Sequence, residues 1–291
     1  MKPPVLKSVL RKLTFRDLRR RRAAARRIAD AIALLDQFPR HQDAPRHDLP
    51  ARLIVSLTSY PARFGTLHLT VKSLLDQSVR ADRLLLWVAH DDIDLLPDTV
   101  KSLQDDRFRI GTCEDIRNFK KILPTLAENP EAFIVIADDD TYYPGDWLSG
   151  LIDSYKAGPP AITFYRGHRP RYTDAGRLAP YRSWVRNAVE EDGSTSQDIL
   201  ATGNGGVLYP PGSLPQQTAD LDLIRELCAT SDDVWLYFMR QLSGWPIRRV
   251  SGPKREFIEW SGTQDESLTA LHLTGKKDEH LQAMSDQFGR P

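Results

Sequence analysis

The chain has few cysteines and no long apolar run. Its 291 residues include only Cys113 and Cys228, too few for a framework of several disulfides and without the close spacing of a metal-binding motif. No segment approaches the roughly 18 apolar residues of a membrane span. The N-terminus also lacks the apolar core and cleavage site of a signal peptide. We therefore expect a cytoplasmic protein with reduced thiols.

Charge is distributed unevenly along a chain of otherwise ordinary composition. The formal net charge is only +1, yet residues 1–30 hold eleven Lys or Arg against two Asp, a net of +9. Residues 31–291 therefore carry a net charge of −8. Such a segregated basic segment is typical of chains that meet an anionic membrane surface, nucleic acid or an acidic partner protein.

Leucine and isoleucine recur at helical spacing on both sides of the arginine-rich block. This pattern predicts a basic amphipathic helical extension over residues 1–40. The helix could be a peripheral anchor, with its arginines on anionic lipid, or a solvated helix packed on the outside of the domain. Periodicity does not decide between the two, because it does not identify what covers the apolar face. Residues 41–50 mix Pro, His, Asp and Arg without periodicity and predict a linker.

Apolar runs alternate with helical patterns from residue 51 onward. The runs LIVSL, LLLWV, FRI and FIVI predict four strands, and amphipathic segments separate them. Four such alternations predict an α/β domain with a mainly parallel, doubly wound sheet and helices on both faces. The second half is less regular. Residues 167–196 form a long polar, aromatic and basic loop of the kind that is often functional.

Three consecutive carboxylates, Asp138, Asp139 and Asp140, end the fourth strand in the stretch FIVIADDDTYYPGDW. Ligands of open α/β sheets bind at the carboxyl ends of the strands, and adjacent carboxylates repel unless a cation neutralises them. Oxygen ligands suit Mg²⁺ or Mn²⁺, which can hold phosphates in turn. The alternative is a solvated acidic turn before the helix that starts near Pro144.

A second acidic pair, Asp232 and Asp233, opens the apolar helix predicted over residues 234–242. These carboxylates could complement the dipole of that helix, or one of them could be a general base pointing into the ligand crevice. The preceding Gly203-Asn204-Gly205-Gly206 permits either close backbone approach to a ligand or a tight bend.

The order of these motifs resembles a known family. The succession SLTSYPARF, LLLWV, FKKILPTL, VIADDDTYYPGDW, GNGGVLYPPGSL and SDDVWLYF, over roughly residues 51 to 250, is similar to bacterial nucleotide-sugar glycosyltransferases of the GT-A fold. Within that family it looks most like the family-2-like enzymes of surface polysaccharide synthesis. The resemblance implies a Rossmann-like catalytic domain over residues 51–291, with a nucleotide-sugar-binding half (51–157) and an acceptor-binding half with the C-terminal tail (158–291).

The resemblance also implies roles for the acidic residues. Asp138 and Asp140 match an Asp-x-Asp pair, with Asp140 the direct metal ligand and Asp138 nearer the ribose or a metal-bound water. Asp233, beside Asp232, matches the general base of inverting members. A third metal ligand is expected from a C-terminal histidine, for which His272 and His280 are the available candidates, and His272 is the one predicted. By the same resemblance, Thr58, Ser59, Tyr60 and Arg63 match the region that holds the nucleotide base and ribose. The predicted nucleotide-binding set also includes Asp138, Asp139, Asp92 from the acidic loop that ends the second strand, and Lys120 and Lys121, which could add charge at the diphosphate.

The function expected from the sequence is therefore metal-dependent glycosyl transfer with inversion. A hexosyl or related sugar would move from a nucleotide-diphosphate donor to a glycan or lipid-linked glycan at the inner face of the plasma membrane. The cofactor would be Mn²⁺ or Mg²⁺. Residues 1–38 would contact an anionic membrane surface or a partner protein, and no nucleic acid is expected.

Two alternatives stand beside this prediction. A sugar nucleotidyltransferase would also bind nucleotide and Mg²⁺ on an α/β sheet, but it would want a glycine-rich, basic loop after the first strand, where residues 58–64 offer only Arg63. The other alternative is a non-enzymatic binding or scaffolding protein that uses the Arg-rich helix.

Overall fold

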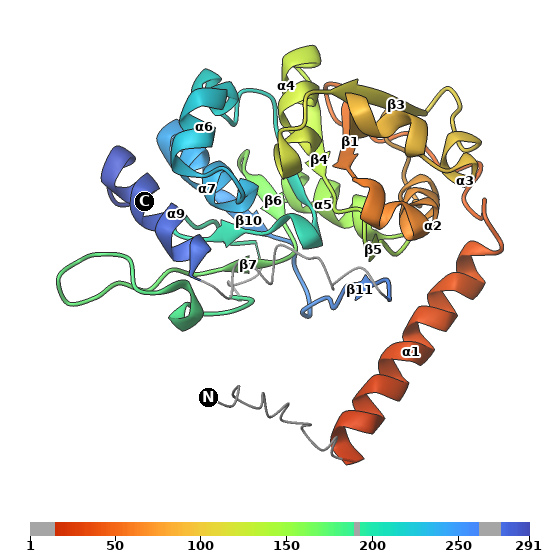
Figure 1. The fold of residues 1–291 in the computed structure, drawn as a ribbon, viewed down its shortest axis with the longest axis horizontal. Coiled ribbons are helices and arrows are strands. Elements are labelled where there is room, and N and C mark those ends of the chain that lie inside the picture. Colours follow the sequence, from red (N-terminus) through yellow and green to blue (C-terminus); the bar gives the residue numbers. More distant parts are fainter. Residues whose placement is uncertain (1–14, 189–192, 262–274) are drawn as a thin grey trace, which may run out of the picture.

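A seven-stranded sheet forms the centre of the molecule in the computed structural model, which describes residues 15–188, 193–261 and 275–291 (Figure 1). The strand order is β10-β6-β9-β4-β1-β2-β3. The strands are β1 (Leu53–Thr58), β2 (Arg83–Ala89), β3 (Phe108–Cys113), β4 (Phe133–Ile136), β6 (Ile162–Phe164), β9 (Val207–Tyr209) and β10 (Ile247–Arg249).

The strand directions confirm the predicted fold class. β1 pairs in parallel with β2 and β4, β2 with β3, and β10 with β6, whereas β9 runs antiparallel to both of its neighbours. The sheet is therefore mainly parallel, and the four apolar runs of the first half are its β1, β2, β3 and β4. Parallel strands need crossovers, and the intervening helices supply them.

Helices cover both faces of the sheet. One face carries α2 (Phe64–Leu75), α3 (Asp98–Lys101) and α5 (Trp147–Lys156). The other carries α4 (Leu123–Glu128), α6 (Leu221–Leu227), α7 (Asp232–Ser243) and α9 (Lys276–Phe288). Short 3-10 turns join these elements: η1 (Pro61–Arg63), η2 (His90–Leu95), η3 (Arg117–Lys121), η4 (Tyr181–Ser183), η5 (Gly203–Gly205) and η6 (Gln216–Ala219).

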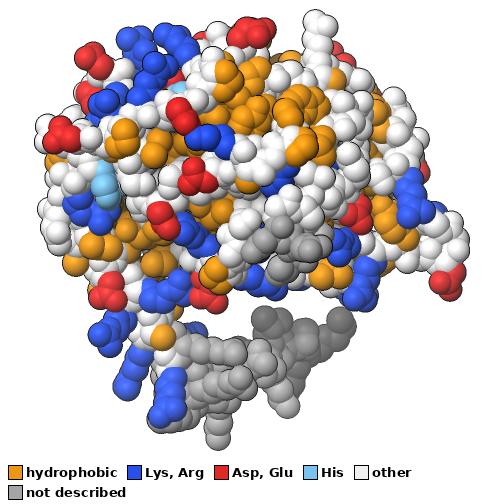
Figure 2. Space-filling model, turned by 180° about the vertical axis from the view of Figure 1, so that it is seen from behind, with side chains coloured by type: hydrophobic (Ala, Val, Ile, Leu, Met, Phe, Trp, Pro, Cys, Tyr) orange, Lys and Arg blue, Asp and Glu red, His pale blue; other side chains and the backbone are white. Residues whose placement is uncertain are grey.

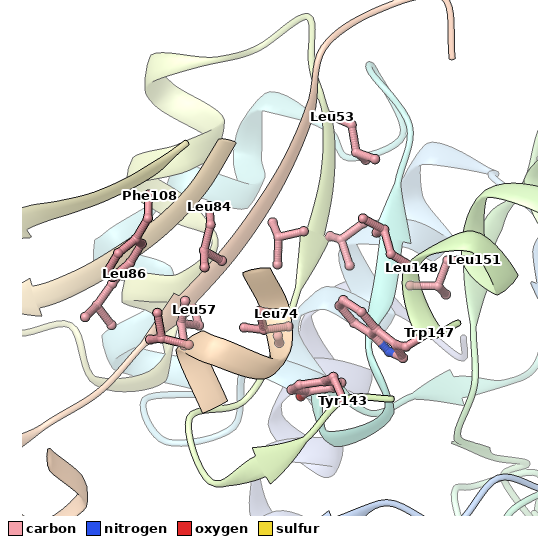
Figure 3. Close-up of a cluster of buried hydrophobic side chains, with 14 of the residues drawn as sticks. Leu53, Leu57, Leu74, Leu84, Leu86, Phe108, Tyr143, Trp147, Leu148 and Leu151 are labelled. Carbon is pink, nitrogen blue, oxygen red and sulfur yellow. The ribbon is translucent and has the colours of Figure 1, made fainter. Parts of the chain in front are cut away.

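Two hydrophobic cores lie on opposite faces of the sheet. On β4, Phe133 and Val135 belong to one core, while Ile134 and Ile136 belong to the other. Figure 3 shows the first core, which extends from Leu84, Leu86 and Phe108 past Leu57 and Leu74 to Trp147 and Leu148 of α5. Burial on both faces explains why this strand reads as a continuous apolar run without alternation.

Four two-residue strands build the rim at one end of the sheet. β5 (Thr141–Tyr142) pairs antiparallel with β11 (Ile258–Glu259), which places Glu259 opposite Thr141. β7 (Gly167–His168) pairs antiparallel with β8 (Leu200–Ala201). These pairings bring segments far apart in the sequence to the carboxyl ends of the central strands.

The N-terminal helix α1 (Phe15–Leu35) extends from this body and is attached through its C-terminal half (Figure 1). Ala31 and Leu35 are buried against Tyr142 and Trp260. Within the described part of the chain, no helix is both long and apolar enough to cross a membrane.

The segment between α1 and β1 is held to the domain by two carboxylates, the buried Asp76 and the partly buried Asp82. The backbone N–H groups of Arg40 and His41 donate to Asp76 Oδ1 at 2.7 and 2.9 Å. His47 Nε2 lies 2.7 Å from Asp82 Oδ2. Asp76 is the residue that follows α2, so its hydrogen bonds tie the segment after α1 to the end of α2. This fixes the point at which α1 leaves the domain.

Candidate functional site

A pocket of about 960 Å³ opens at the carboxyl ends of β1 and β4. Its walls come from η1, η3, the turn after β4, β7, η4, η5 and the first turns of α7 and α9. This is the position at which open α/β sheets bind ligands. Most of the residues predicted from the sequence line it: Thr58, Ser59, Tyr60, Arg63, Lys120, Lys121, Asp138, Asp139, Asp140, Asp232 and Asp233.

Two predicted residues do not join this set. Asp92 lies in η2, after β2, and is not among the residues that line the pocket. Its prediction rested on an acidic loop at a strand end, but β2 is separated from β4 by β1. His272 lies outside the described residues.

The first of three charge clusters surrounds Arg63. Its guanidinium pairs with Asp140 and lies 3.5 Å from Asp139 Oδ1. Ser59 Oγ donates to Asp139 Oδ2 at 2.5 Å. Burial, followed by the charge of Asp140, raises the pKa of Asp139 to about 7. Burial also raises the pKa of Asp140, and the charge of Asp138 adds to that effect.

The second cluster is centred on Lys121 of η3. Its Nζ lies 2.8 Å from Asp138 Oδ1 and 2.7 Å from Asp232 Oδ2, and its side chain is only 5% exposed. Burial alone would lower the pKa of this ammonium, but the charges of Asp138, Asp232 and Asp233 raise it well above its usual value. One buried cation therefore joins the acidic strand end to the second acidic pair.

The third cluster joins Asp233 to the C-terminal helix. Asp233 Oδ1 accepts a hydrogen bond from the backbone N–H of Gly203 at 2.9 Å, and Oδ2 lies 3.8 Å from Lys277 Nζ. Burial and the neighbouring charge of Asp232 raise the pKa of Asp233. Lys277 Nζ also lies 4.3 Å from the centre of the Tyr181 ring.

The glycine motif between these clusters forms a tight bend. Gly206 has φ +89°, and a Cβ at this position would lie 2.5 Å from the Trp147 ring. A Cβ on Gly203 would lie 2.8 Å from Lys121 Nζ. Gly206 is therefore required by its positive φ and by close packing, whereas a side chain at Gly203 would displace the ammonium group of Lys121.

Several pocket residues were missed by sequence reasoning. Glu259 accepts from Asn204 Nδ2 at 3.2 Å, and partial desolvation followed by the charges of Asp140 and Asp138 raises its pKa. The others come from β7, the loop after it and the start of α9. Only the aromatic and basic composition of the long loop hinted at some of them. Arg186, Glu259 and Lys277 were not named from the sequence, whereas Arg166, His168, Tyr181 and Arg182 belong to the basic and aromatic stretch, and Asn204 to the glycine motif, that the sequence had indicated.

Divalent metal binding can be tested against this donor set. Carboxylate oxygens suit a hard cation, and Asp138, Asp140 and Glu259 are close enough to influence one another electrostatically. However, Lys121 and Arg63 occupy two of these carboxylates, and the described residues contain no group of three side chains placed to hold a metal ion. The chemistry of the donors therefore fits, provided that the two ion pairs open.

His168 is a buried neutral histidine at the pocket wall. Its Nδ1 accepts from the backbone N–H of Asn187 at 3.0 Å, so the neutral ring carries its proton on Nε2. Burial, aided by Arg166, Arg186 and Lys277, lowers its pKa to about 3.

Because His168 has a lowered pKa, we expect the free energy of unfolding to decrease in mild acid. Below its unfolded pKa of 6.5 the unfolded chain binds the proton more readily than the folded chain, so stability falls as the pH falls toward 3. The free energy of unfolding should drop by about 2 kcal/mol between about pH 7 and pH 5 through this group. Urea unfolding of His168→Asn should show a shallower acid dependence than wild type, whereas exposed His90→Asn should match wild type. Equal slopes for His168→Asn and wild type would contradict this assignment.

No protein-family model and no curated protein sequence matches the chain. Solved structures similar to it include 4-diphosphocytidyl-2C-methyl-D-erythritol synthase from Anaerococcus prevotii, at 13% identity and a TM-score of 0.46, covering 77% of this chain and 96% of that one. UDP-glucose pyrophosphorylase from Acinetobacter baumannii is also similar, at 9% identity and a TM-score of 0.44. The match covers 83% of this chain and 96% of that one. The inositol-1-phosphate CTP transferase of T. maritima matches at 10% identity and a TM-score of 0.40. This match covers 81% of this chain and 96% of that one. At these scores no activity is carried over to this chain.

The comparison nevertheless corrects the glycosyltransferase prediction. The three similar structures are nucleotidyltransferases, and none is a glycosyltransferase. They correspond to the alternative of nucleotidyl transfer and not to the predicted glycosyl transfer to a glycan. The physical reason is that acidic strand ends and polar turns report where a nucleotide and a cation bind. They do not report which bond of the nucleotide is broken.

Proposed function

We propose that the chain is a nucleotidyltransferase, which binds a nucleoside triphosphate in the pocket and transfers its nucleotidyl group to a sugar phosphate or a related phosphorylated small molecule. The observation that carries the proposal is the row of ion pairs along the pocket. It runs from Arg63 through Lys121 to Lys277, with carboxylates between the cations.

Such a row suits a polyphosphate that arrives with a divalent cation. Buried charges are costly when unpaired, and the carboxylates of the pocket neutralise its lysines and its arginine. Phosphate oxygens can replace the carboxylates as partners of Arg63 and Lys121, because charge-assisted hydrogen bonds to phosphate are equally strong. The released carboxylates, Asp138 and Asp140, would then hold Mg²⁺ or Mn²⁺, with Glu259 beside them. The bound cation would neutralise phosphate charge.

The positive charges proposed to bind phosphate come from η3. The nucleotidyltransferase alternative in the sequence analysis had required them in a glycine-rich loop after the first strand. The loop after β1 contributes only Arg63, but η3 brings the ammonium groups of Lys120 and Lys121 into the pocket. Both lysine side chains are at most 5% exposed. A glycine-rich basic loop after the first strand is therefore not needed to supply cations here.

The proposed reaction breaks one phosphoanhydride bond. An ionised phosphate oxygen of the acceptor attacks the α-phosphorus, the bond from that phosphorus to the bridging oxygen breaks, and pyrophosphate leaves with the electron pair. The attacking oxygen is already ionised, so no general base is required. Arg63 and Lys121 stabilise the charge that develops on the phosphates. Asp233 keeps Gly203 and Lys277 in place.

Two measurements test this proposal. Nucleoside triphosphates with Mg²⁺ or Mn²⁺ should raise the melting temperature, because a ligand that binds only the folded state stabilises it. Pyrophosphate release should then require both a triphosphate and a phosphorylated sugar. The absence of a shift with all four common ribonucleoside triphosphates would contradict the proposal. Pyrophosphate release that is unaffected by every phosphorylated acceptor would contradict the transfer step.

A further inference from the structure

The N-terminal half of α1 carries a stripe of arginines. Arg19, Arg22 and Arg26 are spaced by three and four residues, so they lie on one face of the helix. All three are exposed, as are the three alanines of residues 23–25. Figure 2 shows basic side chains along the part of the molecule that projects at the lower left, where α1 lies. We call this set the arginine stripe.

The arginine stripe points away from the domain. At about 100° per residue, Ala31 and Leu35 lie roughly opposite to it, and they are the residues buried against Tyr142 and Trp260. Arg27, at the flank, pairs with Glu256 at 2.7 Å. The helix is therefore fixed by its apolar face while its basic face remains exposed.

The base of α1 adjoins the pocket. Trp260, against which α1 packs, donates its backbone N–H to the carbonyl of Asp140 at 2.8 Å. Figure 1 shows α1 extending past the edge of the molecule that carries β5 and β11. A surface bound by the arginine stripe would therefore lie on the side of the molecule where the pocket is built.

We propose that α1 docks the protein onto an anionic phospholipid surface through the arginine stripe. Guanidinium groups pair bidentately with phosphate, and the short alanine side chains let the helix approach the headgroups closely. Electrostatic interactions with the lipid surface decay within about 8 Å at physiological salt. The surface therefore attracts the projecting helix, whereas the acidic remainder of the chain lies largely too far away to be repelled.

A polynucleotide fits the same helix less well. Proteins that bind duplex nucleic acid tightly make about 6–10 phosphate contacts along an extended basic track. Here the stripe ends at Asp30, which lies on the same face, and Glu256 flanks it beside Arg27. A lipid surface needs only a local cluster of cations, since the headgroups can gather around it.

Flotation with vesicles tests the proposal on the intact chain. The protein should float with vesicles that contain phosphatidylglycerol, and not with vesicles of phosphatidylcholine alone, and added salt should release it. The triple variant Arg19→Gln, Arg22→Gln, Arg26→Gln should partition about 100-fold more weakly, because each basic residue near an anionic surface contributes about fivefold. The matched control replaces three exposed arginines elsewhere, Arg109, Arg171 and Arg177, with Gln and should bind like wild type.

Each alternative outcome overturns the proposal. Equal flotation with both vesicle types, or equal loss in the control variant, would show that the stripe is not the lipid contact. Binding to duplex DNA or RNA without binding to anionic vesicles would assign the helix to nucleic acid. Pyrophosphate release with soluble substrates is a separate readout that should not change in the triple variant, so failure of lipid binding and failure of nucleotidyl transfer are distinguishable.

Discussion

Lys121→Gln is expected to abolish nucleotide binding and to destabilise the fold by about 3–5 kcal/mol. The ammonium lies between Asp138 and Asp232, and the charge of Asp233 also acts on it. Its removal leaves a carboxylate cluster without its central buried cation, and the pocket also loses a partner for phosphate. Urea unfolding and titration with a nucleoside triphosphate measure the two effects separately.

Two further variants separate charge from packing at this position. Lys121→Gln combined with Asp232→Asn should recover part of the stability, because one unpaired carboxylate is removed, but it should not recover nucleotide binding. Lys156→Gln is the exposed control: its pair with Asp48 is about half solvated and should contribute less than about 1 kcal/mol. Wild-type nucleotide affinity in the Lys121→Gln variant would remove this lysine from the proposed site.

The central strands and the acidic strand end were predictable because their signals are local. β4 is buried on both faces and therefore reads as one apolar run, and the chain turns polar where that run leaves the sheet. Asp138, Asp139 and Asp140 follow the strand directly, so their place at the sheet edge follows from the strand itself. The same reasoning placed Asp232 and Asp233, because they open α7.

The rest of the pocket depends on contacts between distant segments. Glu259 enters because β11, only two residues long, pairs with β5, and Lys277 enters because α9 packs beside α7. The sequence periodicity of β11 and α9 does not indicate which element each of them packs against. The reaction could not be read from the same signals, because motifs at strand ends indicate where a ligand binds and not which of its bonds is broken.

Asp139→Asn is expected to stabilise the metal-free protein in mild alkali and to leave it unchanged in acid. The carboxyl has a pKa of about 7 in the folded chain, against 3.8 in the unfolded chain. The folded state therefore holds the proton more tightly, and this contribution to stability is lost as the pH rises from about 4 through about 7. Between about pH 5 and pH 8 the loss from this group should be about 3 kcal/mol.

Asparagine fits this position because its amide can still engage both neighbours. Its oxygen can accept from Arg63 while its NH₂ donates to the Ser59 hydroxyl, which now bonds Asp139 Oδ2. Urea unfolding in EDTA at about pH 5 and pH 8 should therefore give a flatter pH dependence for Asp139→Asn than for wild type. Exposed Asp174→Asn should follow wild type at both values. Parallel curves for Asp139→Asn and wild type would show that Asp139 is ionised in the folded chain throughout this range, and that Arg63 and Ser59 outweigh its burial.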